Sequence, residues 1–415
     1  MKHWMSLALA LSFLPSAFAN ADSYSVNVLE EVLYQNVKQT VLTKDSQKIN
    51  SRSGFSSFEQ KIFVDAIWDM ADEGSTEAIK ALDSINTIHY DLIEKLRVGI
   101  LRIKYQRALV LPEDVTSELR GVLMNPVAET KLIYTLAAYE EDILKAGHAD
   151  IIELAKNHKQ YFDISEDELR KKEITKDIVA DIFHKTPDVT TYMNGEYVKS
   201  VKIFMFCREN RLYPCLMVMK NVHGEVVRNA DGSIWTHQSL ASSARGLPSY
   251  TRNGNTPAGI LTIDSVMPVA DQQMSFGKFR RMMLNFVPKS KDEVLLKSLL
   301  PQTSHKEDWW RTSVTARDIG RSLFRIHGTG KINQDPTTPY YPFMRTSGCI
   351  AQRENTYSDV TYKDQRELLD DVMKAMDMEP TFENELKVKG ILYLVEIDDQ
   401  NAPVDAKDLT LRGIE

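Results

Sequence analysis

The chain has 415 residues, which is enough for two or three domains and a sizeable hydrophobic core. Its 43% hydrophobic and 26% charged residues are ordinary for a soluble globular protein, and the formal net charge is −7. Lysines and arginines are interspersed with acids and form no basic block, so the composition argues against a nucleic-acid partner.

The first 19 residues have the pattern of a signal peptide. Lys2 and His3 form a short positive region, and residues 5–14 form an apolar stretch too short for a mature membrane span. Ala17-Phe18-Ala19 fits a cleavage site, and no later apolar run reaches about 18 residues. We therefore expect a periplasmic protein, exported by its signal peptide and without a transmembrane anchor.

A helical domain is predicted over residues 22–195, because apolar residues recur there at helical spacing. The expected helices cover residues 58–74, 76–85, 90–109, 112–124, 129–145, 148–158 and 166–184. Short amphipathic helices joined by short turns are typical of a solenoid, but no clean repeat period is visible, so an irregular bundle is an equal alternative. Its histidines form no metal-binding pair. This domain is either a plain scaffold or a groove for a protein partner or polymer strand.

Composition changes near residues 186–199, where Thr, Pro and Gly indicate a linker. The following region, residues 196–400, is predicted to be mostly β, and residues 401–415 read as a polar tail. Expected strands lie at 201–206, 216–220, 225–229, 260–266, 322–326 and 388–397, with helices near 291–300 and at 363–378. The long stretch from Met267 to Arg321 resembles the excursions that form lids or substrate walls.

Three cysteines are present, and export places them in an oxidising compartment. Cys207 and Cys215 flank a short turn and are weakly predicted to form a disulfide across a hairpin. That pairing would leave Cys349 as a free thiol, which an odd cysteine count in an exported protein suggests. The alternative is that all three are buried thiols.

The stretch from Phe324 to Asn355 holds His327 and Cys349, each beside a glycine. A strand ending at a histidine, followed by a cysteine in a small-residue turn, suits a thiolate nucleophile and its base. Gly348 would let a substrate approach, and the backbone N–H groups of Gly348 and Cys349 could hold an oxyanion. Either Thr329 or the carbonyl of Gly328 could orient the imidazole. No metal or nucleotide motif is visible, so no cofactor is expected.

Three segments in the right order resemble the catalytic domain of the L,D-transpeptidases, the YkuD domain. They are Thr256-Pro257-Ala258-Gly259-Ile260, Ile326-His327-Gly328-Thr329 and Thr346-Ser347-Gly348-Cys349-Ile350. The resemblance covers roughly residues 196–400 and marks a divergent member with an additional N-terminal helical domain. It implies a mostly β fold with a helical insertion, peptidoglycan stem peptides as substrates and a part in cell wall organisation and cell shape.

The resemblance also implies roles for individual residues. Cys349 would attack the carbonyl before a terminal D-amino acid and form an acyl-enzyme, with His327 as base. An amine acceptor would then give a 3–3 cross-link or attach a protein. Water as acceptor would make the protein an L,D-carboxypeptidase that trims tetrapeptides to tripeptides. A third reading is a non-catalytic, exported wall-binding scaffold.

Substrate-binding candidates surround the cysteine. Arg345 and Arg353 could pair with substrate carboxylates, and Tyr341 could form a wall of the groove. Ser347 stands where the family usually has a second histidine, and Ala351 where Arg or Asn is usual. These two departures bear on the choice of substrate and acceptor more than on the nucleophile.

Overall fold

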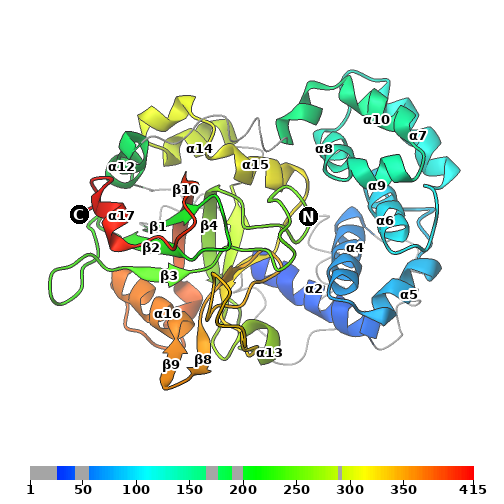
Figure 1. The fold of residues 1–415 in the computed structure, drawn as a ribbon. Coiled ribbons are helices and arrows are strands. Elements are labelled where there is room, and N and C mark those ends of the chain that lie inside the picture. The colour runs from blue at the N-terminus through cyan, green and yellow to red at the C-terminus, as the bar shows by residue number, and fades with distance from the viewer. Residues whose placement is uncertain (1–25, 43–55, 165–175, 189–199, 288–291) are drawn as a thin grey trace. The chain divides into compact units, whose positions relative to one another are not determined.

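The computed structural model describes residues 26–42, 56–164, 176–188, 200–287 and 292–415. The expected signal peptide and most of the expected linker lie outside these residues. An N-terminal helical region is followed by a mixed β region with a nearly closed eight-stranded sheet (Figure 1). The chain divides into two compact units between Ile164 and Ser165, which we call the helical unit and the β unit.

The helical unit consists of helices that follow the predicted order, preceded by α2, which was not among the expected helices. They are α2 (Val26–Leu42), α4 (Ser57–Asp72), α5 (Thr76–Ser84), α6 (Leu92–Lys104), α7 (Glu113–Leu123), α8 (Thr130–Ala138), α9 (Glu140–Lys145), α10 (Ala149–Lys156) and the 3₁₀ helix η3 (Lys159–Ile164). The single helix expected over 129–145 is two helices, because the chain leaves helical geometry at Tyr139 (φ −121°).

Helix α4 is the buried centre of the helical unit. A capping box of Ser56 and Glu59 starts it, and nearly all of its residues from Gln60 onward are buried. Its buried face includes Asp65, which accepts hydrogen bonds from Arg97 of α6 at 2.5 Å and from Lys61 at 2.9 Å. The charge that this helix buries is therefore paired inside the unit.

The β unit is built on one mixed sheet with the strand order β3-β2-β1-β10-β4-β5-β6-β7. The strands are β1 (Val201–Arg208), β2 (Cys215–Lys220), β3 (His237–Ser239), β4 (Gly259–Val266), β5 (Met282–Phe286), β6 (Phe324–His327), β7 (Ile350–Ala351) and β10 (Lys389–Asp398). The pairs β1–β10 and β6–β7 are parallel, and the others are antiparallel. Strands β8 (Glu354–Tyr357) and β9 (Val360–Lys363) form a separate hairpin.

The two edges of the sheet meet at a single bridge. Leu240, which follows β3, exchanges backbone hydrogen bonds of 3.1 and 2.8 Å with Ala351 of β7. This pairing leaves little free edge and nearly closes the sheet. The strand expected at 225–229 contributes only isolated bridges, from Val226 to Lys220 and from Arg228 to Ile234, because tight turns flank it on both sides.

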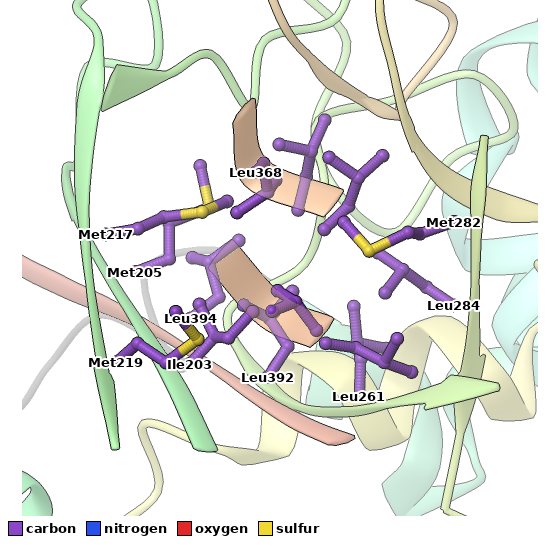
Figure 2. Packing of buried hydrophobic residues seen from close by; sticks show 14 of the residues in the cluster. Ile203, Met205, Met217, Met219, Leu261, Met282, Leu284, Leu368, Leu392 and Leu394 are labelled. Carbon is purple, nitrogen blue, oxygen red and sulfur yellow. The ribbon is translucent and has the colours of Figure 1, made fainter. Parts of the chain in front are cut away.

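The inner face of the sheet curls around helix α16 (Asp364–Ala375), as Figure 2 shows. Leu368 of α16 packs among side chains from opposite parts of the sheet, including Met217 of β2 and Met282 of β5. The strands alternate, so β6 sends Phe324 and Ile326 into this core and turns the residues between and after them outward.

A second core covers the outer face of β1, β2, β4 and β10. Helices α12 (Lys176–Lys185), α14 (Asp292–Leu299) and α17 (Ala406–Thr410) contribute to it, and so do Trp309 and Trp310. Phe183 of α12 packs edge-to-face on Phe204 of β1 at 5.1 Å between ring centroids. The last helix of the expected helical domain therefore belongs to the β unit, and the division falls well before residue 196.

Residues 401–415 are not an exposed polar tail. Leu409 and Ile414 are buried in the second core, and Arg208 of β1 is bonded to Asp408 at 2.7 Å. A polar sequence concealed this packing, because the charged residues are neutralised in pairs rather than solvated. Helix α15 (Arg311–Asp318) and the 3₁₀ helices η5 (Gln302–Lys306) and η6 (Asn384–Lys387) complete the described elements, together with α13 below.

Candidate active site

The parallel pairing of β6 and β7 brings His327 and Cys349 to one face of the sheet. Ile326 pairs with Ile350 and His327 pairs with Ala351. Cys349 immediately precedes β7, so the register continues to place it beside Arg325. Because alternate strand residues share a face, Arg325, His327 and Cys349 all lie on the face opposite the α16 core. The two residues that the sequence singled out lie on the same face of adjacent strands, two register positions apart.

Cys349 is a buried free thiol, with 6% of its surface exposed. Its sulfur lies 3.7 Å from Nη1 of Arg325 and 3.9 Å from the backbone oxygen of Leu323. The guanidinium donates to the sulfur, and the thiol donates to the carbonyl. A positive charge therefore contacts the nucleophile candidate directly.

His327 is oriented through its own strand end. Ring Nδ1 is 2.5 Å from the carbonyl oxygen of Gly328. A carbonyl oxygen only accepts hydrogen bonds, so this contact assigns the proton of the neutral ring to Nδ1 and leaves Nε2 as the basic nitrogen. The imidazole has the tautomer that a general base needs.

The turn before Cys349 requires glycine at position 348. Gly348 has φ +102°, and a Cβ there would lie 2.5 Å from Nη2 of Arg321 and 2.5 Å from the carbonyl oxygen of Gly254. The hydroxyl of Thr256 donates to the Gly348 carbonyl at 2.9 Å, and that of Thr346 to the Cys349 carbonyl at 2.6 Å. The segments that resemble the family thus meet at this turn.

A short cover lies over these side chains. It consists of helix α13 (Gln273–Phe276) with Gly277 and Lys278, near the start of the excursion expected from Met267 to Arg321. The ring of Phe276 meets His327 edge-on at 5.0 Å and lies 5.2 Å from the guanidinium of Arg325. The cover contributes to the burial of His327 and of the Arg325–Cys349 contact.

Thr329 anchors the cover and does not orient the histidine. Its hydroxyl donates to the carbonyl of Met274 in α13 at 3.2 Å, and the backbone of Gly330 donates to Gln273 at 3.0 Å. Thr329 and the Gly328 carbonyl were the two groups expected to orient the imidazole, and it is the Gly328 carbonyl that bonds to Nδ1.

Glu354 lies beneath the cover as a buried carboxyl group. Oε2 accepts a hydrogen bond of 2.8 Å from the backbone N–H of Lys278, and Oε1 has no hydrogen-bond partner among the described residues. The carboxyl group is so close to Gly328 that a Cβ there would meet it at 2.2 Å. Burial raises the pKa of Glu354 to about 6, against the opposing effect of the Lys278 N–H.

The substrate-binding candidates separate into two groups. Arg345 is half-buried with its guanidinium 5.2 Å from the ring of Tyr340, and no acidic partner exists for it among the described residues. Ser347 is exposed. Arg353, by contrast, is paired with Asp364 at 2.6 Å. Arg345 and Ser347 remain open to a ligand, whereas the charge of Arg353 is already neutralised.

Tyr341 is half-buried and packs edge-on against Tyr357 of β8 at 5.5 Å. Cys207 and Cys215 form a disulfide with a Cα–Cα distance of 4.4 Å between the end of β1 and the start of β2. Cys349 is the remaining cysteine, and the structure leaves it as a thiol.

Three site residues escaped the sequence reasoning: Arg325, Phe276 and Glu354. Arg325 could have been identified from the sequence, because the alternation Phe324-Arg325-Ile326-His327 places the arginine and histidine on the same face of a strand. Phe276 and Glu354 left no such signal, because each reaches the site only through the folding of a loop.

Comparisons with known proteins returned no match from a family model, a curated protein or a solved structure. Within the described ranges, no group of three or more His, Cys, Asp and Glu side chains could hold a metal ion. In the same ranges, no helix has the length and apolar character of a membrane span.

Proposed function

We propose that this protein is an exported cysteine acyltransferase of the L,D-transpeptidase type, acting on peptidoglycan stem peptides in the periplasm. The observation that carries the proposal is the β6–β7 register, which puts Cys349 and His327 on one face of neighbouring strands. The resemblance of three sequence segments supplies the substrate class, and their meeting at the Gly348 turn supports it.

The first half-reaction uses the tautomer of His327. Nε2 takes the thiol proton of Cys349, and the sulfur attacks the carbonyl carbon before the terminal D-amino acid. The new S–C bond turns the carbonyl oxygen into an oxyanion. When the C–N bond breaks, the leaving amine takes the proton from His327 and an acyl-enzyme remains.

The second half-reaction reverses these proton movements. An acceptor amine attacks the thioester, gives its proton to His327 and forms the new amide bond, while the C–S bond breaks and the thiol regains its proton. Arg345 is the remaining carboxylate-binding candidate, because Arg353 is committed to Asp364.

Mass spectrometry after incubation with a carbapenem tests the nucleophile. We expect one adduct on Cys349 in the wild-type protein and none in Cys349→Ala. An unmodified wild-type protein would count against the proposal.

Purified muropeptides then separate the possible acceptors. Dimers with 3–3 links indicate transpeptidation, and tripeptide monomers alone indicate an L,D-carboxypeptidase. If Cys349→Ala retained the full cellular function of the wild type, the scaffold reading would replace the enzyme.

A further inference from the structure

We propose that Arg325 is the charge partner of Cys349 and stabilises the thiolate that forms when the sulfur gives up its proton. Its part in catalysis rests on the proposed function, but its effect on the thiol does not. The motif pair of histidine and cysteine assigns this task to His327 alone. The structure places a guanidinium nitrogen 3.7 Å from the sulfur.

The position of Arg325 follows from the strand that carries it. It lies between Phe324 and Ile326, which point into the α16 core, so its side chain emerges on the face of His327 and Cys349. Its other strand neighbour in register is Met283 of β5, an apolar side chain. Only 7% of the arginine is exposed, and the Phe276 ring lies over it at 5.2 Å.

This burial strengthens the interaction. A charge pair shielded from water experiences a lower effective dielectric than a pair on the surface, so a guanidinium here stabilises an anion more strongly. The guanidinium stays charged over the whole working range of pH, whereas an imidazole does not. Arg325 can therefore stabilise the thiolate anion while Nε2 of His327 carries the proton that it took from the thiol and later gives to the leaving amine.

The other charged groups around the sulfur are occupied elsewhere. Arg321 binds the carbonyl oxygens of Gly254 and Asn255, each at 2.8 Å. Arg281, which immediately precedes β5, pairs with Asp271 at 2.6 Å. On the acidic side, Glu354 accepts from Lys278 below the cover. Of these groups, Arg325 is the one whose guanidinium bonds to the sulfur.

Alkylation of Cys349 across a range of pH tests this role, because thiolates react and thiols do not. Cys349 is the only cysteine outside the disulfide, so iodoacetamide reports on it alone. We expect Arg325→Gln to slow the reaction near neutral pH by about tenfold and to move the half-maximal rate to higher pH. Arg325→Lys keeps the charge, and we expect its rate to stay within about threefold of wild type.

Arg281→Gln is the matched control. Its guanidinium lies 4.1 Å from the same Phe276 ring but pairs with Asp271, so its removal takes away a neighbouring positive charge and no bond to the sulfur. We expect the pH of its half-maximal alkylation rate to match wild type. A wild-type rate in Arg325→Gln, or equal losses in the lysine and glutamine variants, would overturn the proposal.

Two further measurements separate the remaining explanations. If only the anionic reagent iodoacetate slows in Arg325→Gln, the residue docks anions and the thiolate role is wrong. His327→Gln leaves Arg325 intact, and we expect it to keep at least about a tenth of the wild-type rate with iodoacetamide; complete loss would assign the thiolate to the histidine. None of these readouts uses muropeptides, so failure of the proposed reaction would leave them informative.

Discussion

In the helical unit, the buried carboxylate of Asp65 contacts two cations, Arg97 and Lys61. In the β unit, the buried carboxyl of Glu354 accepts a backbone hydrogen bond at one oxygen and has no partner for the other among the described residues. The pairing of Asp65 stabilises the helical unit, because burying a charge together with its partners costs less free energy than burying it alone. The arrangement in the β unit leaves a desolvated carboxyl group against Gly328, the residue that follows His327. The carboxylate of Asp65 is thus buried with two cations, whereas Glu354 is buried without one, and that burial raises its pKa.

The largest expected effect is a loss of turnover on replacing His327, a residue of the β unit. Replacing His327 by Gln removes the general base, so turnover of muropeptides should fall by about 100- to 10,000-fold. The β unit should stay folded, which circular dichroism and thermal melting would check. Unchanged turnover would mean that another group moves the proton.

Arg97→Met tests the paired charge of the helical unit. It leaves the carboxylates of Asp65 and Glu94 buried without their shared guanidinium, a loss that typically costs about 3–5 kcal/mol of unfolding free energy. Hydrogen exchange should show faster opening of α4 and α6 and an unchanged sheet.

The control for this substitution is Arg107→Gln, which removes an exposed pair with Asp83 and should have little effect. Equal destabilisation by the two variants would contradict the distinction between buried and exposed pairs in this unit.

Gly348→Ala examines the turn before the nucleophile. The added Cβ meets Arg321 and Gly254 at 2.5 Å, and the backbone is also strained at positive φ, so we expect a loss of about 1–3 kcal/mol in unfolding free energy and slower acylation of Cys349. Gly413 also has positive φ but no atom within 4 Å of its Cβ position. Gly413→Ala should therefore show the smaller loss and normal acylation.

Glu354→Gln gives the smallest and most pH-dependent effect. The pKa of Glu354 rises from an ordinary 4.5 to about 6 on folding, so its contribution to stability is complete below pH 4.5 and is lost as pH rises through about 6. Glutamine carries no such charge. The variant should gain about 1 kcal/mol over wild type at neutral pH and none in acid.

Denaturant melts of both proteins at several pH values would measure this difference. A constant difference across that range would show that folding does not change the pKa of Glu354 and would contradict the prediction. The outcome bears directly on the contrast between the two units, because Asp65 is paired with Arg97 and Lys61.

The fold could be predicted from the sequence where the hydrophobic pattern of a single segment is enough to define a helix or strand. The amphipathic helices and the apolar run that becomes β10 were visible for that reason. Strand β7 has only two residues, and β3 has three, so neither shows a periodicity; both exist because distant partners supply their hydrogen bonds. The closure of the sheet at Leu240 and Ala351 was hidden from the sequence for the same reason.

The candidate site divides in a similar way. Cys349, His327 and Gly348 could be named from motif and spacing, and the Cys207–Cys215 pairing from cysteine parity. Two outcomes depend on which loops meet in space. Arg353 is paired with Asp364, and Thr329 bonds to Met274 of the cover instead of orienting the imidazole. Sequence letters show which groups are present, but not which of them already have partners.

Helix α12 has a practical consequence for anyone who wants the β unit as a separate fragment. A fragment that starts at residue 196 would lack Val179, Ile182 and Phe183, whose side chains fill the second core against Phe204 and Phe206. Those aromatic rings would face water and favour aggregation during expression. A fragment that begins upstream of Lys176 keeps the helix, and secretion with an intact Cys207–Cys215 bond would suit its folding.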